Sequence, residues 1–196
     1  MPVAKVNIVE AGADVLRARA GAVSARLFKS QELNDFVRLM LVTMNEAPGV
    51  GLAAPQIGVP LRVIVFGDTD NNTRYLTAKE REQRGRVVIG PEVWINPSFT
   101  PMSDRKVTFF EGCLSVPGFQ AKVERYEEIE LRGLDENGDE KESLQLRGWP
   151  ARIVQHEIDH LDGVLYVDRM DSKTLATIGS LSRKTAHDLN MLLGLT

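Results

Sequence analysis

Cysteine and histidine are scarce in this chain of 196 residues, which has one cysteine, Cys113, and three histidines. A single cysteine excludes an intrachain disulfide and is typical of proteins from reducing compartments. No apolar run approaches the roughly 20 residues that a membrane-spanning helix needs, and the first ten residues lack the basic start and apolar centre of a secretory signal. The net charge of −3 leaves no basic excess. We therefore expect neither a membrane nor a nucleic acid as partner.

Three segments have the apolar spacing or the terminal residues of helices. We expect a helix over residues 30–47, capped by Ser30, with its apolar side chains on one face. Pro150 suits the first turn of a second helix, which runs to about Asp162 and is closed by Gly163. Asp171 or Ser172 is predicted to cap a C-terminal amphipathic helix, whose apolar residues are Leu175, Ile178, Leu181, Leu189 and Leu192.

Short β-rich segments lie between the first two helices. The Asn137-Gly138 pair predicts a hairpin turn, and the polar stretch 67–86 predicts a long surface loop. Strands precede the main helix instead of alternating with it, which favours an α+β class with antiparallel sheets. The length suits one domain over residues 1–196. The predicted strands are 61–66, 87–95, 106–110, 121–125, 129–134 and 143–146.

Two of the three histidines, His156 and His160, are four residues apart in the predicted second helix. Both imidazoles then lie on one face and can bind one metal ion. Glu157 lies beside the first ligand, where it can exchange a proton with a water on that metal. The alternative is a surface helix with two histidines at chance spacing. The pattern favours a mononuclear metal-dependent hydrolase.

A catalytic site of this type needs a third protein ligand and one open position. One metalloprotease class places a third histidine where this chain has Tyr166, and another uses a downstream glutamate, yet none follows Glu157. A fourth ligand for a structural site would have to be His187, which we interpret as a solvated histidine. Cys113 is the remaining soft donor, although free cysteines are often only small buried hydrophobes. The predicted ligands are Cys113, His156 and His160.

Three segments resemble, in order and spacing, the signature motifs of the peptide deformylase family. The likeness extends from the helix at Ser30 to about Met170. Residues 67–86, the Phe109-Phe110 pair and residues 116–119 are similar to the organelle-type branch. The three segments are GVGLAAPQ at 49–56, EGCLS at 111–115 and QHEIDHL at 155–161.

The resemblance implies antiparallel sheets around the histidine-bearing helix, and a single catalytic domain. It implies that the substrate is the N-formyl-methionyl end of a nascent polypeptide, met during transient association with the ribosome. The implied cofactor is one divalent metal ion, usually Fe²⁺, with Zn²⁺, Ni²⁺ or Co²⁺ also able to bind. Ligand type alone would suggest zinc.

The resemblance also implies catalytic roles. A metal lowers the pKa of a bound water and polarises the formyl carbonyl, while Glu157 takes the water proton and passes it to the departing amine. Gln56 is the best side-chain donor to the developing oxyanion, although a loop hydrogen bond is the alternative. The matching family position adds the backbone N–H of Leu114.

Substrate contacts are expected on both sides of the metal. Gly51 and Gly112 allow close backbone approach, so that a peptide can pair as an extra strand. Trp149 and Ile153 are candidates for the methionine pocket, with core packing as the alternative. The resemblance places the strand pairing at Val50, Gly51, Leu52 and residues 112–115.

Two charged positions complete the expectations. Glu111 and Arg152 are predicted to form an ion pair that steadies the cysteine loop. Many family members carry arginine at the position of Gln120, so its substrate contact is not carried over.

The alternative functions are a metallo-amidase or peptidase of other specificity, and an inactive homologue that binds peptides or ribosomes. The start at Met1 favours a bacterial cytoplasm, and an organelle enzyme with its leader removed is the alternative.

Overall fold

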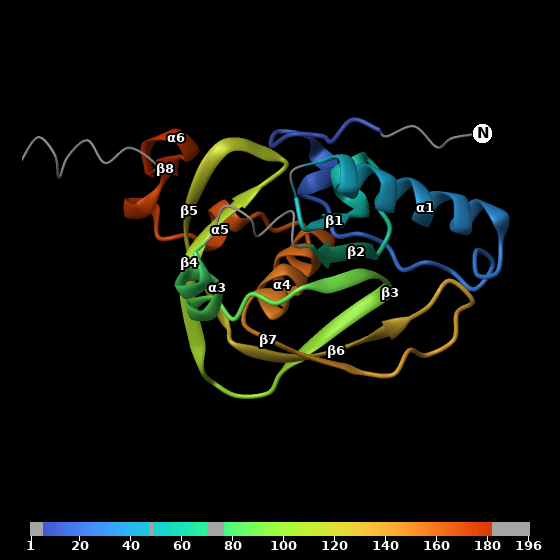
Figure 1. The fold of residues 1–196 in the computed structure, drawn as a ribbon. Coiled ribbons are helices and arrows are strands. Elements are labelled where there is room, and N and C mark those ends of the chain that lie inside the picture. Colours follow the sequence, from blue (N-terminus) through green and yellow to red (C-terminus); the bar gives the residue numbers. More distant parts are fainter. Residues whose placement is uncertain (1–5, 48, 70–76, 182–196) are drawn as a thin grey trace, which may run out of the picture.

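A central helix, α4 (Trp149–Leu161), packs between two antiparallel β-sheets (Figure 1). The computed structural model describes residues 6–47, 49–69 and 77–181. The predicted α+β class with antiparallel sheets around this helix is confirmed. The first sheet has the order β1-β2-β3-β6-β7, formed by β1 (Gly51–Ala53), β2 (Val63–Asp68), β3 (Ile89–Pro101), β6 (Glu128–Leu134) and β7 (Leu144–Arg147).

The second sheet has the order β4-β5-β8 and carries the cysteine. A tight turn joins its two long strands and places Cys113 opposite Val116. Its strands are β4 (Lys106–Cys113), β5 (Val116–Tyr126) and β8 (Ala176–Thr177). The other elements are α1 (Gln31–Glu46), α3 (Ala78–Gln83), α5 (Tyr166–Arg169) and α6 (Ile178–Leu181), with 3-10 turns at Asp14–Leu16, Ala54–Ile57 and Ser172–Thr174.

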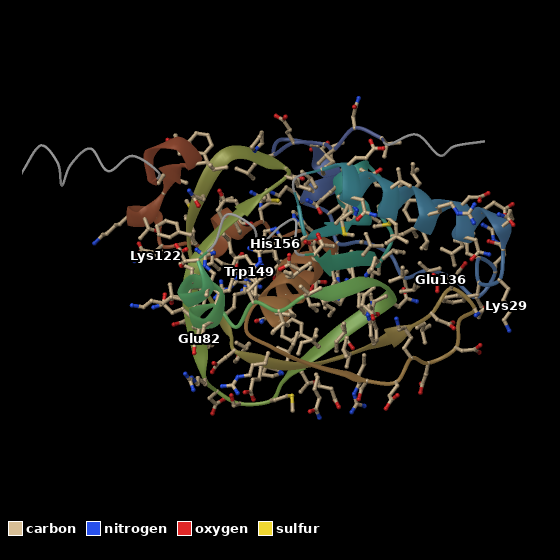
Figure 2. All side chains as sticks on the ribbon, in the orientation of Figure 1. Lys29, Glu82, Lys122, Glu136, Trp149 and His156 are labelled. Carbon is tan, nitrogen blue, oxygen red and sulfur yellow. The ribbon has the colours of Figure 1, made fainter. Side chains whose placement is uncertain are left out.

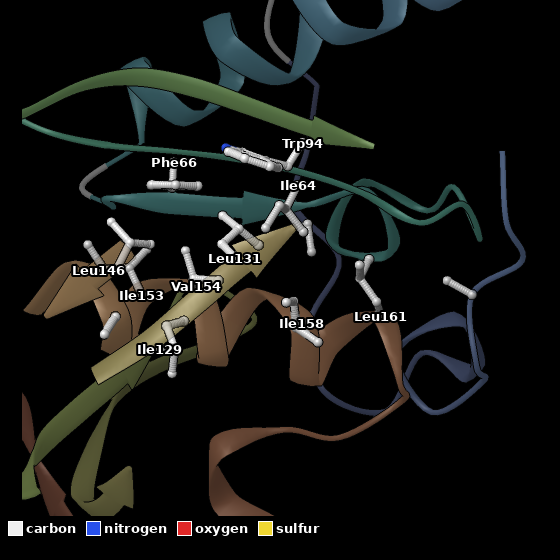
Figure 3. Packing of buried hydrophobic residues seen from close by; sticks show 13 residues of the cluster. Ile64, Phe66, Trp94, Ile129, Leu131, Leu146, Ile153, Val154, Ile158 and Leu161 are labelled. Atoms are coloured by element: carbon white, nitrogen blue, oxygen red, sulfur yellow. The ribbon is translucent and has the colours of Figure 1, made fainter. Parts of the chain in front are cut away.

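Strand β2 is buried at all of its positions and separates two hydrophobic clusters. Ile64 and Phe66 belong to the cluster under α4, whereas Val63 and Val65 belong to the cluster under α1. Because successive side chains of a strand point to opposite faces, α1 and α4 cover opposite faces of the first sheet. Burial of one such side chain contributes about 1.5–3 kcal/mol. Figure 3 shows that α4 contributes Ile153, Val154, Ile158 and Leu161 to its cluster.

The predicted start of the first helix and both predicted ends of the second are confirmed. The Ser30 hydroxyl accepts a hydrogen bond from the N–H of Leu33 at 3.1 Å. Pro150 lies in the first turn of α4, and Gly163 follows its end with a φ of 75°. A Cβ at Gly163 would lie 2.6 Å from the carbonyl oxygen of Arg17, so a residue without a side chain is required for the chain to leave the helix here.

The prediction of a loop over 67–86 is wrong in two places. Strand β2 runs to Asp68, and helix α3 follows Thr77, whose side chain accepts a hydrogen bond from the N–H of Glu80 while the Glu80 carboxylate accepts from the N–H of Thr77. This reciprocal cap satisfies two backbone donors at the helix start. Residues 70–76 lie outside the described residues.

Several strands are longer than predicted, β3 and β5 by the most, and β4 runs on to Cys113. Strand β3 continues beyond Ile95 because its second half pairs with β6 after an irregularity, at which Asn96 has a φ of 49°. Strand β5 begins at Val116, before the predicted start at Ala121. The predicted hairpin around Asn137-Gly138 is confirmed by the pairing of β6 with β7.

The C-terminal helix begins later than predicted. Asp171 caps only a short 3-10 turn, since residues 176 and 177 pair with Gln120 and Phe119 of β5. Leu175 therefore lies before the helix, which starts at Ile178. Leu189 and Leu192 lie outside the described residues. Among the helices of the described part, none has the length and apolar character needed to span a membrane.

Candidate metal centre

The end of strand β4 and one face of α4 bring together three side chains that can bind a metal ion. The Sγ of Cys113 lies 3.2 Å from the Nε2 of His160, and the ring centroids of His156 and His160 are 5.1 Å apart. One ligand atom from each residue lies within 4.8 Å of the others. A thiol and two imidazoles at these distances suit one transition-metal ion.

A buried carboxylate orients the first histidine. The Oε2 of Glu111 lies 3.0 Å from the Nδ1 of His156, which leaves the other ring nitrogen available to a metal. Arg125 donates two hydrogen bonds of 2.9 Å to the same carboxylate, and Arg152 donates one of 2.5 Å. The predicted pair of Glu111 and Arg152 is thus present, within a larger network.

The charges of this network stabilise one another in a buried setting. Burial by itself raises the pKa of the Glu111 carboxyl, but hydrogen bonds from His156 and Arg125 outweigh it and hold this pKa well below its usual range. Arg125 also donates to Asp159 at 2.5 Å, and Arg169 donates to Asp159 at 2.7 and 2.8 Å. The network therefore joins β4, β5, α4 and α5 directly behind the histidines.

The acid/base candidate, Glu157, faces β1 from the buried side of α4. Its side chain is 4% exposed, and its Oε2 has no hydrogen-bond partner among the described residues. Burial raises the pKa of Glu157 to about 7. A carboxyl group with such a pKa can both accept and release a proton near neutral pH.

The amide of Gln56 has a fixed orientation. Its Oε1 accepts a hydrogen bond from the N–H of Ala53 at 2.8 Å. The Nε2 therefore faces the centre, 3.7 Å from the Sγ of Cys113 and 3.3 Å from the Oγ of Ser115. The oxygen of the Gln56 amide thus makes the loop hydrogen bond that was the alternative interpretation. Its nitrogen faces the centre, where the predicted role as a donor requires it.

The predicted peptide-pairing positions lie on the two strands that flank the centre or directly next to their ends. Gly51 pairs with Phe66 inside the first sheet, and Leu52 is fully buried. The carbonyl of Val50 accepts a hydrogen bond from Gly67 at 2.9 Å. On the other side, Gly112 pairs with Gln120, and Leu114 lies in the turn after Cys113.

The two candidate pocket residues lie in different surroundings. Ile153 is 4% exposed and packs in the cluster under α4. Trp149 is half-buried at the start of α4, and the guanidinium carbons of Arg84 and Arg86 each lie 5.2 Å from its ring centroid. Figure 2 labels Trp149 and His156, which both belong to α4. Their pocket role stays a prediction, and His187 lies outside the described residues.

Sequence reasoning missed Arg125 and Asp159. A signal for Arg125 was present, because it follows Ala121 and Val123 at every second position of β5, on the buried face. An arginine in line with buried apolar residues requires a buried anion. Asp159 lies inside the histidine motif and carried no separate signal.

The fold and this centre together define a metal-dependent hydrolase. A family model described as polypeptide deformylase matches residues 5–176, and the chain belongs to this family. Peptide deformylase 1 of Streptomyces coelicolor is 47% identical over 179 residues, which are 89% of this chain and 78% of that protein. Chloroplastic peptide deformylase 1A of Solanum lycopersicum is 44% identical over 175 residues, 89% of this chain and 63% of that protein, less than two thirds of its length.

A solved structure that is similar to this chain comes from the same family. The class I type b peptide deformylase from Acinetobacter baumannii with Met-Ala-Ser bound is 33% identical and has a TM-score of 0.76, covering 86% of this chain and 100% of that chain. The predicted family and fold are confirmed. The relatives include chloroplastic, mitochondrial and bacterial proteins.

Proposed function

We propose that this protein hydrolyses the formyl amide of N-formyl-methionyl polypeptides and releases formate. The observation that carries the proposal is the cluster of Cys113, His156 and His160, together with a buried Glu157 that follows the first histidine in α4. Family membership supports the formyl substrate. The peptide bound to the Acinetobacter baumannii relative, Met-Ala-Ser, supports a methionyl N-terminus.

Cys113, His156 and His160 would hold one divalent metal ion, and Fe²⁺ is the ion we propose for the cell. The donor set fits such an ion, because one thiol and two imidazoles are transition-metal ligands and Glu111 holds the Nδ1 of His156. When bound, the metal supplies a lowered pKa for water and polarises a carbonyl.

The protein side chains carry the proton transfers. Glu157 accepts the proton of the attacking water on its carboxylate and delivers it to the nitrogen of the departing amine. The Nε2 of Gln56 donates to the carbonyl oxygen as negative charge develops there, and the backbone N–H of Leu114 is the second donor. Because its Oε1 is held by the N–H of Ala53, Gln56 needs no reorientation during the reaction.

The substrate peptide lies between β1 and the end of β4. It pairs with the backbone at Val50, Gly51, Leu52 and Gly112, and its methionine side chain lies toward Trp149 and Ile153. We extend the proposal to nascent chains at the ribosome as the natural substrate. The assignment to a bacterial cytoplasm stays a prediction, since the relatives divide among bacteria and organelles.

Formate release from a formyl-Met-Ala-Ser peptide tests the activity. We expect turnover of this peptide and no cleavage of the unformylated control. Cleavage of the unformylated peptide would favour the metallopeptidase alternative, and binding without turnover would favour the inactive homologue.

The Glu157→Gln variant tests the acid/base assignment. We expect a fall in kcat of at least about 100- to 10,000-fold, because Gln cannot accept the water proton, with metal content unchanged. The matched control is Glu124→Gln on the solvent side of β5, where the Glu124 side chain is 62% exposed. Near-normal turnover by Glu157→Gln would remove Glu157 from the mechanism.

The Cys113→Ser variant and exposure to air test the metal. Replacing the thiol should weaken metal affinity, as measured against a chelator, and unaltered affinity would exclude Cys113 as a ligand. Iron-loaded protein purified without oxygen should lose activity in air, since ferrous iron and thiolate both oxidise. Activity that survives air would contradict a ferrous centre with a thiolate ligand.

A further inference from the structure

Gly51 faces the acid/base candidate directly. A Cβ added to Gly51 would lie 2.7 Å from the Cδ and 2.9 Å from the Cγ of Glu157, and it would also overlap the Oε1. Atoms of this kind do not approach so closely, so any side chain at position 51 must displace the carboxylate. The carboxylate has little room to move, because Glu157 is only 4% exposed between α4 and β1.

The backbone of Gly51 gives no other reason for a glycine. Gly51 is not among the residues with positive φ, and it pairs with Phe66 in regular antiparallel register. Glycine in such a strand weakens it, because it loses more conformational freedom on folding and packs nothing. The space beside Glu157 is therefore the feature that requires a residue without a side chain.

We propose that Gly51 is a positioning residue, which sets where the carboxylate of Glu157 lies. One carboxylate oxygen, Oε1, occupies the space that a side chain at position 51 would fill. The other, Oε2, has no hydrogen-bond partner in the described part of the chain. This inference rests on the proposed function and adds a steric role to the backbone pairing expected of Gly51.

The Gly51→Ala variant tests this role, with Gly90→Ala in β3 as the matched control, since a Cβ at Gly90 would meet nothing within 4 Å. Displacement of a catalytic group by about 1 Å costs on the order of 100-fold in rate. We expect a fall in kcat of that size for Gly51→Ala, with KM and metal content close to wild type. The control should behave as wild type. A raised KM with unchanged kcat would overturn the proposal and assign Gly51 to substrate pairing alone.

A second measurement does not depend on activity. The melting temperatures of Gly51→Ala are compared in two backgrounds, the wild type and Glu157→Ala, which has no carboxylate to displace. We expect Gly51→Ala to lower the melting temperature by a few degrees in the first background and to have little effect in the second. An equal loss of melting temperature in both backgrounds would overturn the proposed steric contact between position 51 and the Glu157 carboxylate. If the wild-type protein releases no formate, the proposed function fails, while this comparison still decides the role of Gly51.

Discussion

Two groups of ion pairs in this molecule have similar distances and opposite surroundings. Behind the histidines, Arg125 and Glu111 lie 2.9 Å apart and their side chains are each 4% exposed. On β6, Arg132 and Glu130 lie 2.7 Å apart, with exposures of 66% and 24%. The distance between the charged atoms therefore does not tell which pair matters more for stability. Water screens and replaces the exposed contact, whereas the buried charges depend on each other, and loss of one leaves the other uncompensated.

The largest expected effect comes from Arg125→Met, which removes the shared partner of Glu111 and Asp159. Both carboxylates are buried, so we expect a loss of about 3–5 kcal/mol in the free energy of unfolding. Urea denaturation of the metal-free protein measures it. A loss below about 1 kcal/mol would mean that Arg152 and Arg169 compensate fully, and the contrast between the two groups would fail.

A smaller effect, on metal affinity, is expected from Glu111→Gln. This change removes the charge but keeps the shape of the side chain and an acceptor for the Nδ1 of His156. Residues that orient a metal ligand are typically worth 10- to 100-fold in metal affinity. We expect a decrease of roughly that size, about 1.4–2.7 kcal/mol, in competition with a chelator. Glu130→Gln is the control and should leave affinity unchanged. Equal affinities for both variants would show that the buried carboxylate does not act on the metal.

The smallest effect is expected from Arg132→Met on the exposed side. The free energy of unfolding should change by less than about 1 kcal/mol, and any difference from wild type should disappear at 1 M salt, because screening is then nearly complete. Parallel urea titrations at low and high salt provide the measurement. A loss comparable to that of Arg125→Met would refute burial as the property that separates the two groups.

The parts of the fold that depend on local spacing were predictable. Ser30 caps α1, Pro150 opens α4, and residues 137–138 turn the hairpin between β6 and β7. Pairing with distant strands decided the rest. Leu175 belongs to no helix because residues 176–177 join β5, and β3 continues past Ile95 because β6 offers a partner.

The sequence by itself determined which residues can do the chemistry. A helix places His156 and His160 on one face with Glu157 beside them, since its repeat of 3.6 residues is a local property. Cys113 could be identified as a candidate ligand because it is the single thiol in the chain. Only the tertiary structure decided what surrounds them. Arg125 meets Asp159, and Gly51 makes room for Glu157, because these contacts join residues far apart in the chain, and no local pattern records such pairings.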